Sequence, residues 1–300
     1  MTRELPAELA RHLVQLLKRT RRRYRKRLVR CQEKFSETAV HELRVETRRA
    51  LALLDLVQAL EMDGPLKKPR KNLKSRLDAF DDLRDAQVGL LILKPLLAEF
   101  PEAAGFAAFL RKRERSLIAQ LRSELKALKP RRVERMLKSL EKDVAAARGS
   151  SAGATAASAA LMKPLNAAFQ RAATLRKRVR RTDTETIHRT RIAFKTFRYL
   201  CELLQPFLPW MTARRLREMH AWQVRMGDIQ DVEVLLDRME RTVKHNDVRL
   251  ETVKRLHAAL ARRLVILVNR FVRTADQLEH FRPRFATFPA TTGPHPARRR

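Results

Sequence analysis

The stretch His41-Glu-Leu-Arg44-Val-Glu-Thr-Arg48-Arg49 has a second copy in the same chain, 147 residues further on, as His188-Arg-Thr-Arg191-Ile-Ala-Phe-Lys195-Thr-Phe-Arg198. An α-helix turns by about 100° per residue, so the first, fourth and eighth positions of each copy fall within one narrow stripe. Each copy is therefore predicted to direct one imidazole and two cations to the same side of a helix.

The repetition extends beyond the basic positions. Asp55 and Glu202 each follow their histidine by fourteen residues and rejoin the same stripe. Further on, Leu83-Arg-Asp85-Ala-Gln-Val88 corresponds to Ile229-Gln-Asp231-Val-Glu-Val234, at an offset one residue shorter. Acidic and basic positions that recur at nearly constant offsets indicate a duplicated helical unit.

The composition predicts an all-α protein with an anionic partner. Of the 300 residues, 44% are apolar, which is enough for a sizeable core, and glycine is scarce at seven. The 66 lysines and arginines exceed the 33 acidic residues by a formal charge of +33. Such an excess repels itself in the folded state unless an anion is bound, so a polyanion is the expected partner.

Two cysteines exclude a disulfide framework and favour a reducing compartment. Acidic residues and a proline stand near the N-terminus where a secretory signal would be apolar, and arginines interrupt the apolar stretch 260–272. We therefore expect a cytoplasmic protein without a membrane span.

The chain is predicted to form one domain over residues 1–281, made of two helical repeats. These repeats are expected at about 5–148 and 156–281, joined by a linker of small residues at 149–158. Residues 282–300 contain several prolines and end in three arginines, so a disordered basic tail is expected there. Ser36 and the stretch 182–185 are predicted to cap the helices that carry the two motifs. In the second repeat, helices are expected at 161–180, 183–205, 211–226, 228–244 and 248–279.

The two copies resemble the CHAD domain, the conserved histidine α-helical domain, over about residues 5–281. The resemblance rests on His41-x-x-Arg44-Val-x-x-Arg48-Arg49, on His188-x-x-Arg191-Ile-x-x-Lys195 with Arg198-Tyr199-x-x-Glu202, and on Arg84-Asp85 with Val88. The second repeat departs from the pattern with Gln230 beside Asp231, so a role for the arginine at that place is expected in the first repeat alone.

The resemblance implies two four-helix bundles related by a pseudo-twofold axis, with a basic groove or channel between them. It also implies binding of inorganic polyphosphate, association with polyphosphate granules, and no catalysis by the domain itself. The chemistry of the residues supports the same ligand, since arginine forks and lysine ammonium groups match phosphate oxygens and histidine adds a donor as the pH falls. The residues predicted to bind polyphosphate are His41, Arg44, Arg48, Arg49, Lys71, Lys74, His188, Arg191, Lys195, Arg198 and Arg217.

Alternative interpretations remain for the same residues. The stripes fit ordinary solvated helix faces, and each histidine fits a role in orienting Asp55, Glu202 or a neighbouring helix. A metal site would need His41 and His188 to meet across the dyad, but no helix carries histidines one turn apart and no Cys-x-x-Cys accompanies them. We expect no metal and no cofactor.

Two other functional classes compete with polyphosphate binding. An enzyme of the triphosphate-tunnel type would carry Glu-x-Glu-x-Lys on a β-barrel strand, and the chain has no Glu-x-Glu and no phosphate-binding Gly-rich loop. Nucleic-acid binding fits the charge, but two tryptophans and two tyrosines leave little for base stacking. Weak, salt-sensitive binding to DNA or RNA is expected of any protein this basic.

Overall fold

The structure, a computed structural model, describes residues 5–60, 66–128, 130–147, 154–245 and 247–286. In these ranges the regular structure is helical, and Arg180 and Asp183 form an isolated β-bridge. The α-helices are α1 (Ala7–Glu33), α2 (Glu37–Ala59), α3 (Lys67–Asp78), α4 (Asp81–Leu96), α5 (Ala104–Lys126), α6 (Pro130–Ala146), α7 (Ala154–Lys177), α8 (Thr184–Leu204), α9 (Ala213–Lys244) and α10 (Lys254–Arg273). Short 3₁₀ helices lie at η1 (Pro101–Ala103), η2 (Gln205–Phe207), η3 (Leu250–Thr252) and η4 (Ala275–Phe281). The predicted all-α class is confirmed.

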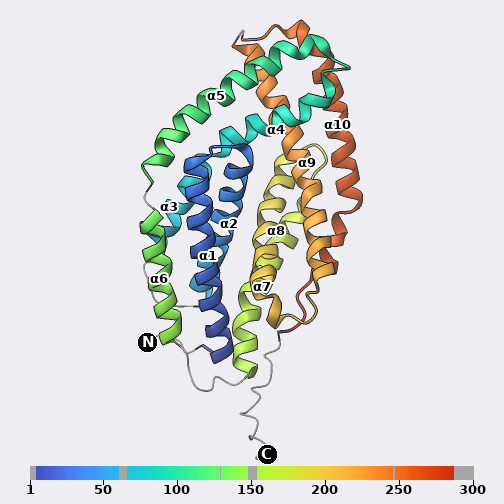
Figure 1. Ribbon diagram of the computed structural model, residues 1–300. Coiled ribbons are helices and arrows are strands. Elements are labelled where there is room, and N and C mark those ends of the chain that lie inside the picture. The colour runs from blue at the N-terminus through green and yellow to red at the C-terminus, as the bar shows by residue number, and fades with distance from the viewer. Residues whose placement is uncertain (1–4, 61–65, 129, 148–153, 246, 287–300) are drawn as a thin grey trace, which may run out of the picture.

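The helices run mostly lengthwise through an elongated molecule (Figure 1). Helix α1 packs between α2 and α6, while α8 packs between α7 and α9, and α10 covers α9. The N-terminal and C-terminal halves of the chain meet where α2 contacts α8 and where α4 contacts α9. These two contacts bring the duplicated motifs, on α2 and α8, together at the boundary between the two halves of the chain.

The packing of both motif helices follows from their apolar faces. On α2 the buried apolar positions include Leu43, Ala50, Leu53 and Val57, and on α8 they include Phe194. Each fully buried side chain of this size contributes about 1.5–3 kcal/mol. On each of the two helices, the basic stripe thereby lies on the side opposite the apolar face.

The predicted cap of α2 is confirmed, and that of α8 is wrong. The Ser36 hydroxyl accepts a hydrogen bond from the Ala39 amide at 3.2 Å. Helix α8 begins after Asp183 without a side-chain cap. The Thr186 hydroxyl, one turn inside, instead accepts from the Arg180 amide at 3.0 Å. This bond satisfies the Arg180 amide in the loop before the helix.

Helix α9 is one continuous helix, so the prediction of two helices at 211–226 and 228–244 is wrong. Gly227, taken as a break in the sequence, is buried in the middle of the helix. A glycine inside a helix costs only about 1 kcal/mol relative to alanine. Packing against α8, α4 and α10 on either side of Gly227 outweighs that cost.

Two predicted boundaries also differ. Helix α7 begins at Ala154, so the last part of the predicted linker 149–158 is helical, which suits its many alanines; residues 149–153 lie outside the described ranges. The predicted tail is ordered at its start, because the Trp210 indole donates to the Phe285 carbonyl and the Ser158 hydroxyl donates to the Ala286 carbonyl. Residues 287–300 lie outside the described ranges.

The core has a second, smaller apolar cluster where α4, α5, α9 and α10 meet. Gly89 allows α4 to lie close here, because a Cβ atom at this position would stand 3.1 Å from a Leu235 methyl and 3.3 Å from a Leu110 methyl. This close approach fixes α4 against α9 and thereby positions the residues of α4 that precede Gly89.

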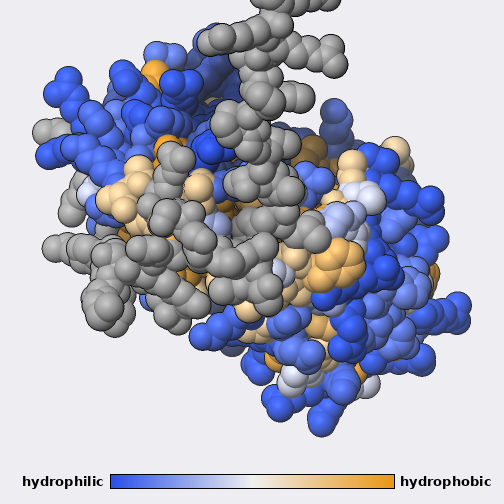
Figure 2. Space-filling view, turned by 90° about the horizontal axis from the view of Figure 1, so that it is seen from below, coloured by the Kyte–Doolittle hydropathy of each residue, from blue (hydrophilic) through white to orange (hydrophobic). Residues whose placement is uncertain are grey.

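The outer surface is largely hydrophilic. From below, hydrophilic residues cover the flanks of the molecule and apolar residues are seen nearer the middle (Figure 2). Part of the basic run of α1 is neutralised, since Arg21 pairs with Glu141 at 2.7 Å and both Arg27 and Arg30 pair with Glu42. No helix within the described ranges is long and apolar enough to span a membrane.

Candidate anion-binding site

A cavity of about 620 Å³ lies at the boundary between the two halves of the chain. We call it the central cavity, and its walls come from α2, α4, α8 and α9. Its basic lining residues are His41, Arg44, Arg48, Arg49, Arg84, His188, Arg191, Lys195, Arg198 and His220. Its acidic and neutral polar lining residues are Asp81, Asp85, Tyr199, Glu202, Gln223, Asp228, Gln230 and Asp231.

Eight of the eleven residues predicted to bind polyphosphate line this cavity: His41, Arg44, Arg48, Arg49, His188, Arg191, Lys195 and Arg198. The other three do not. Lys74 lies on the wall of a neighbouring cleft, while Lys71 and Arg217 are exposed and line neither space. The structure thus brings the two motif stripes together and leaves Lys71, Lys74 and Arg217 outside the cavity.

Within the described residues, the three cations Arg48, Arg191 and Lys195 take part in no ion pair and no hydrogen bond. All three are partly buried. The Nε of Arg191 and the Nδ1 of His188 are fully buried and have no hydrogen-bond partner among the described residues. Buried polar groups are normally satisfied, so these donors indicate a ligand that supplies acceptor oxygens.

Two other arginines of the motifs are already engaged. Arg44 is only 4% exposed, and its guanidinium donates to Asp81 at 2.8 Å and to the Leu77 carbonyl at 3.1 Å. Arg198 donates to Gln223 at 2.9 Å and pairs with Glu202. These bonds connect α2 to the α3–α4 junction and α8 to α9, so both arginines also hold the cavity walls in place.

The duplicated acidic positions therefore differ in role. Glu202 lines the central cavity and pairs with Arg198, whereas Asp55 lies further along α2, outside that cavity, and pairs with Arg70. Neither carboxylate is bonded to a histidine. Within the described residues these two acids are bonded to arginines, so no contact supports the alternative in which the histidines orient them.

Burial and mutual repulsion strongly disfavour the charged forms of the central cations. Burial, followed by the charges of Arg48 and Arg191, lowers the pKa of Lys195 from 10.5 to about 6. Burial and the nearby Arg44 lower the pKa of Arg48 to about 10. The pKa of His41 is also lowered, first by burial and then by Arg84 and Arg48. A bound polyanion would reverse these effects.

Four of the acidic side chains of the cavity, Asp81, Asp85, Asp228 and Asp231, belong to α4 and α9, and Glu202 of α8 is paired with Arg198. Burial raises the pKa of Asp85 to about 6, with a further contribution from Asp81. Burial likewise raises the pKa values of Asp228 and Asp231, against the opposing charge of Arg191. The cavity thus has a cationic side formed by α2 and α8 and a partly acidic side formed by α4 and α9.

Several lining residues were not predicted as part of the site, and most of them lie on α9. His220, Gln223, Gly227, Gln230 and Val234 recur every three or four residues and form one stripe. The periodicity was in the sequence, but the predicted break at Gly227 divided it between two helices. Tyr199, on α8, lies under the Arg198 guanidinium at 4.8 Å from its ring centre.

Within the described residues, no three or more histidine, cysteine or acidic side chains are grouped so as to hold a metal ion. The arrangement that does exist is a buried array of donors, which matches phosphate, sulfate or carboxylate oxygens.

Comparison with known proteins assigns the fold and the family. No curated protein matches the chain. A crystal structure titled as the CHAD domain from the plant Ricinus communis superposes with a TM-score of 0.73 at 18% identity, covering 95% of this chain and 96% of that one. The family model described as CHAD domain matches residues 7–240, more than three quarters of the sequence. The chain therefore belongs to the CHAD domain family.

Proposed function

We propose that the central cavity binds inorganic polyphosphate without catalysis. The observation that carries this proposal is the set of partly buried cations Arg48, Arg191 and Lys195, which make no ion pair within the described residues and line one cavity from α2 and α8. A linear phosphate chain supplies about one negative charge per unit and acceptor oxygens on every side. It would satisfy all three cations, together with the buried donors of Arg191 and His188.

The resemblance of the motifs to the CHAD family supports this ligand, since that family is associated with polyphosphate. It also supports a location at polyphosphate granules in the cytoplasm. The predicted absence of catalysis and of cofactors belongs to the same proposal.

We further infer that the two halves are repeats related by a pseudo-twofold axis, with the central cavity as the basic groove between them. Support comes from equivalent pairs that line the same cavity: His41 with His188, Arg48 with Lys195, and Asp85 with Asp231. The contacts of α2 with α8 and of α4 with α9 join equivalent segments. On this inference, Arg48→Gln and Lys195→Gln weaken polyphosphate binding by similar factors at a pH where both cations are charged in the complex.

The test compares two variants that lose the same charge. Arg48→Gln/Arg191→Gln removes two cations from the central cavity, and Arg22→Gln/Lys26→Gln removes two exposed cations from the outer face of α1. Binding of long-chain polyphosphate is measured by titration calorimetry at fixed ionic strength. Charge-assisted hydrogen bonds contribute about 1.5–3 kcal/mol each, so the cavity variant should bind roughly hundredfold more weakly. The α1 variant should stay within about threefold, because surface charges are screened over about 8 Å.

Equal losses in the two variants would show that binding is diffuse and would reject the cavity as the site. Nucleic-acid binding is the second candidate function, favoured by the net charge of +33. It is distinguished by competition: duplex DNA should displace polyphosphate poorly at moderate salt if the cavity selects a thin, flexible phosphate chain.

A further inference from the structure

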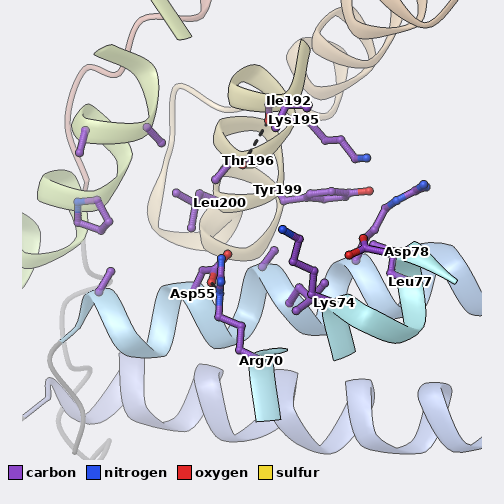
Figure 3. Close-up of a pocket in the computed structure, with 17 residues that line it drawn as sticks. Asp55, Arg70, Lys74, Leu77, Asp78, Ile192, Lys195, Thr196, Tyr199 and Leu200 are labelled. Carbon is purple, nitrogen blue, oxygen red and sulfur yellow. Dashed lines mark hydrogen bonds and ion pairs between the residues drawn. The ribbon is translucent and has the colours of Figure 1, made fainter. Parts of the chain in front are cut away.

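A second hollow adjoins the central cavity on the far side of Arg48, Lys195 and Tyr199, which line both spaces. We call this hollow the side cleft. It has a volume of about 450 Å³ and lies between α2, α3, α7 and α8. Figure 3 shows Lys195, Thr196 and Tyr199 entering it from α8, with Lys74 and Leu77 of α3 on the opposite side.

The side cleft differs in chemistry from the central cavity, because most of its wall is apolar. The apolar lining residues are Leu51, Ala52, Ala59, Leu77, Pro164, Ala167, Ala168, Ile192 and Leu200. The residues that α7 contributes to the wall are small, namely Pro164, Ala167 and Ala168, and Ile192 of α8 is 51% exposed at the cleft. Pockets of a few hundred cubic ångströms with apolar walls and a few convergent polar groups are typical of sites for small organic ligands.

The polar groups of the side cleft define the charge of its ligand. Arg48 and Lys195 have no ion-pair partner within the described residues, and Lys74 adds a third cation from α3. Of the two carboxylates on the wall, Asp55 is neutralised by Arg70, which leaves Asp78. The side cleft therefore has an excess of positive charge where it borders the central cavity. Elsewhere its wall is apolar.

We propose that the side cleft binds an organic anion with an apolar body, the anionic group lying against Arg48 and Lys195 and the body against α7 and α8. The ring of Tyr199 gives this body an aromatic surface to contact. Inorganic polyphosphate has no apolar part and would leave these walls exposed to water, so the ligand of the side cleft is of a different class. Because both spaces share Arg48 and Lys195, the two ligands compete, a consequence that rests on the proposed polyphosphate site.

The test uses two fluorescent probes with the same apolar body. 1-Anilinonaphthalene-8-sulfonate carries an anionic group, and N-phenyl-1-naphthylamine lacks it. The folded protein should bind the sulfonate with one-to-one stoichiometry and at least about tenfold more tightly than the neutral probe, because the neutral probe cannot make the charge-assisted contact to Arg48 and Lys195. Equal affinities for the two probes would overturn the proposal.

Variants then locate the probe. Ala168→Phe and Thr196→Trp fill the side cleft from α7 and from the exposed face of α8, while Asn166→Phe places an aromatic ring on α7 outside it. Each filling variant should reduce sulfonate binding at least about tenfold, and Asn166→Phe should leave it unchanged; thermal melting confirms which variants are folded. Sulfonate binding that survives both filling substitutions would place the probe elsewhere and refute the site.

A final arm separates this proposal from the proposed function. Arg191 lines the central cavity but not the side cleft, so Arg191→Gln should weaken polyphosphate binding and retain the sulfonate. Arg48→Gln should weaken both ligands. If Arg191→Gln leaves polyphosphate binding intact while the filling variants still abolish sulfonate binding, the proposed function fails and the side cleft stands.

Discussion

Polyphosphate binding should draw a proton from solution onto Lys195. In the empty protein, burial and the charges of Arg48 and Arg191 hold the pKa of this lysine at about 6. At pH 7 only about one tenth of the molecules then carry the proton. A phosphate chain beside the amine replaces the repulsion by attraction and should return the pKa towards its ordinary value of 10.5.

The magnitude follows from these two values. Binding at pH 7 should take up about 0.9 proton per protein through Lys195, and about one proton at pH 8. Below pH 5 the uptake should fall to about 0.1 proton, because the empty protein is already charged there. By linkage, this lysine alone should make the affinity fall roughly hundredfold between pH 5 and pH 8.

The assay is titration calorimetry in two buffers of different ionisation enthalpy, repeated from pH 5 to pH 8. Lys195→Arg is the matched control, because it keeps a permanent charge on a side chain of similar length. This variant should still bind polyphosphate at pH 8, but its binding should lack the proton uptake that Lys195 contributes. No uptake by the wild-type protein at pH 8, or the same uptake by Lys195→Arg, would refute the placement of phosphate beside Lys195.

Four further outcomes are expected. The pKa of His41 is lowered by burial and by Arg84, so a bound polyanion that raises this pKa again should add proton uptake through His41; a His41→Ala variant that keeps the full uptake would remove this histidine from the site. In the empty protein the unfolded chain binds the Lys195 proton more strongly than the folded chain does, so stability should rise with pH between about 6 and 10.5, and Lys195→Met should flatten the slope seen in urea titrations. The pH dependence that Asp85 gives to stability has the opposite sign, because its pKa is raised to about 6 and the stability it contributes is lost as the pH rises through that value. Asp85→Asn should therefore stabilise the protein by about 1 kcal/mol at pH 8, after allowance for solvent screening, and have little effect at pH 4. An equal gain in the free energy of unfolding at both pH values would contradict this. A Cβ at Gly227 would lie at an ordinary contact distance of 3.6 Å from the Arg191 guanidinium, so Gly227→Ala should raise the free energy of unfolding by about 0.5–1 kcal/mol and retain polyphosphate binding. Gly227→Leu should cover that guanidinium and weaken polyphosphate binding. Equal polyphosphate binding by the two variants would contradict this prediction.

Much of the fold could be predicted because duplication and periodicity are local signals. The motif helices α2 and α8 were predicted from basic and apolar stripes that a helix must separate, and eight predicted site residues do line one cavity. The errors arose where tertiary packing overrides local preference. Gly227 indicated a break, yet helices on several sides hold α9 straight through it.

The pairing of individual cations was beyond the sequence for a similar reason. Arg44 and Arg191 occupy equivalent positions in the two copies, but within the described residues only Arg44 forms an ion pair, with Asp81 at the start of α4. At the offset of 146 residues the position equivalent to Asp81 is Gly227, in the middle of α9, which has no side chain to pair with Arg191. Which cation stays unpaired thus depends on a residue outside the motifs that only the fold brings beside them.

The most direct measurement is a crystal structure of the protein with a polyphosphate of defined length. If polyphosphate binds in the central cavity, phosphate groups should be found there, with oxygens about 2.7–3.2 Å from Arg191 Nε and from the terminal nitrogens of Arg48 and Lys195. Phosphate found on the outer face of α1 or elsewhere on the basic surface, with the central cavity free of it, would contradict binding in the cavity.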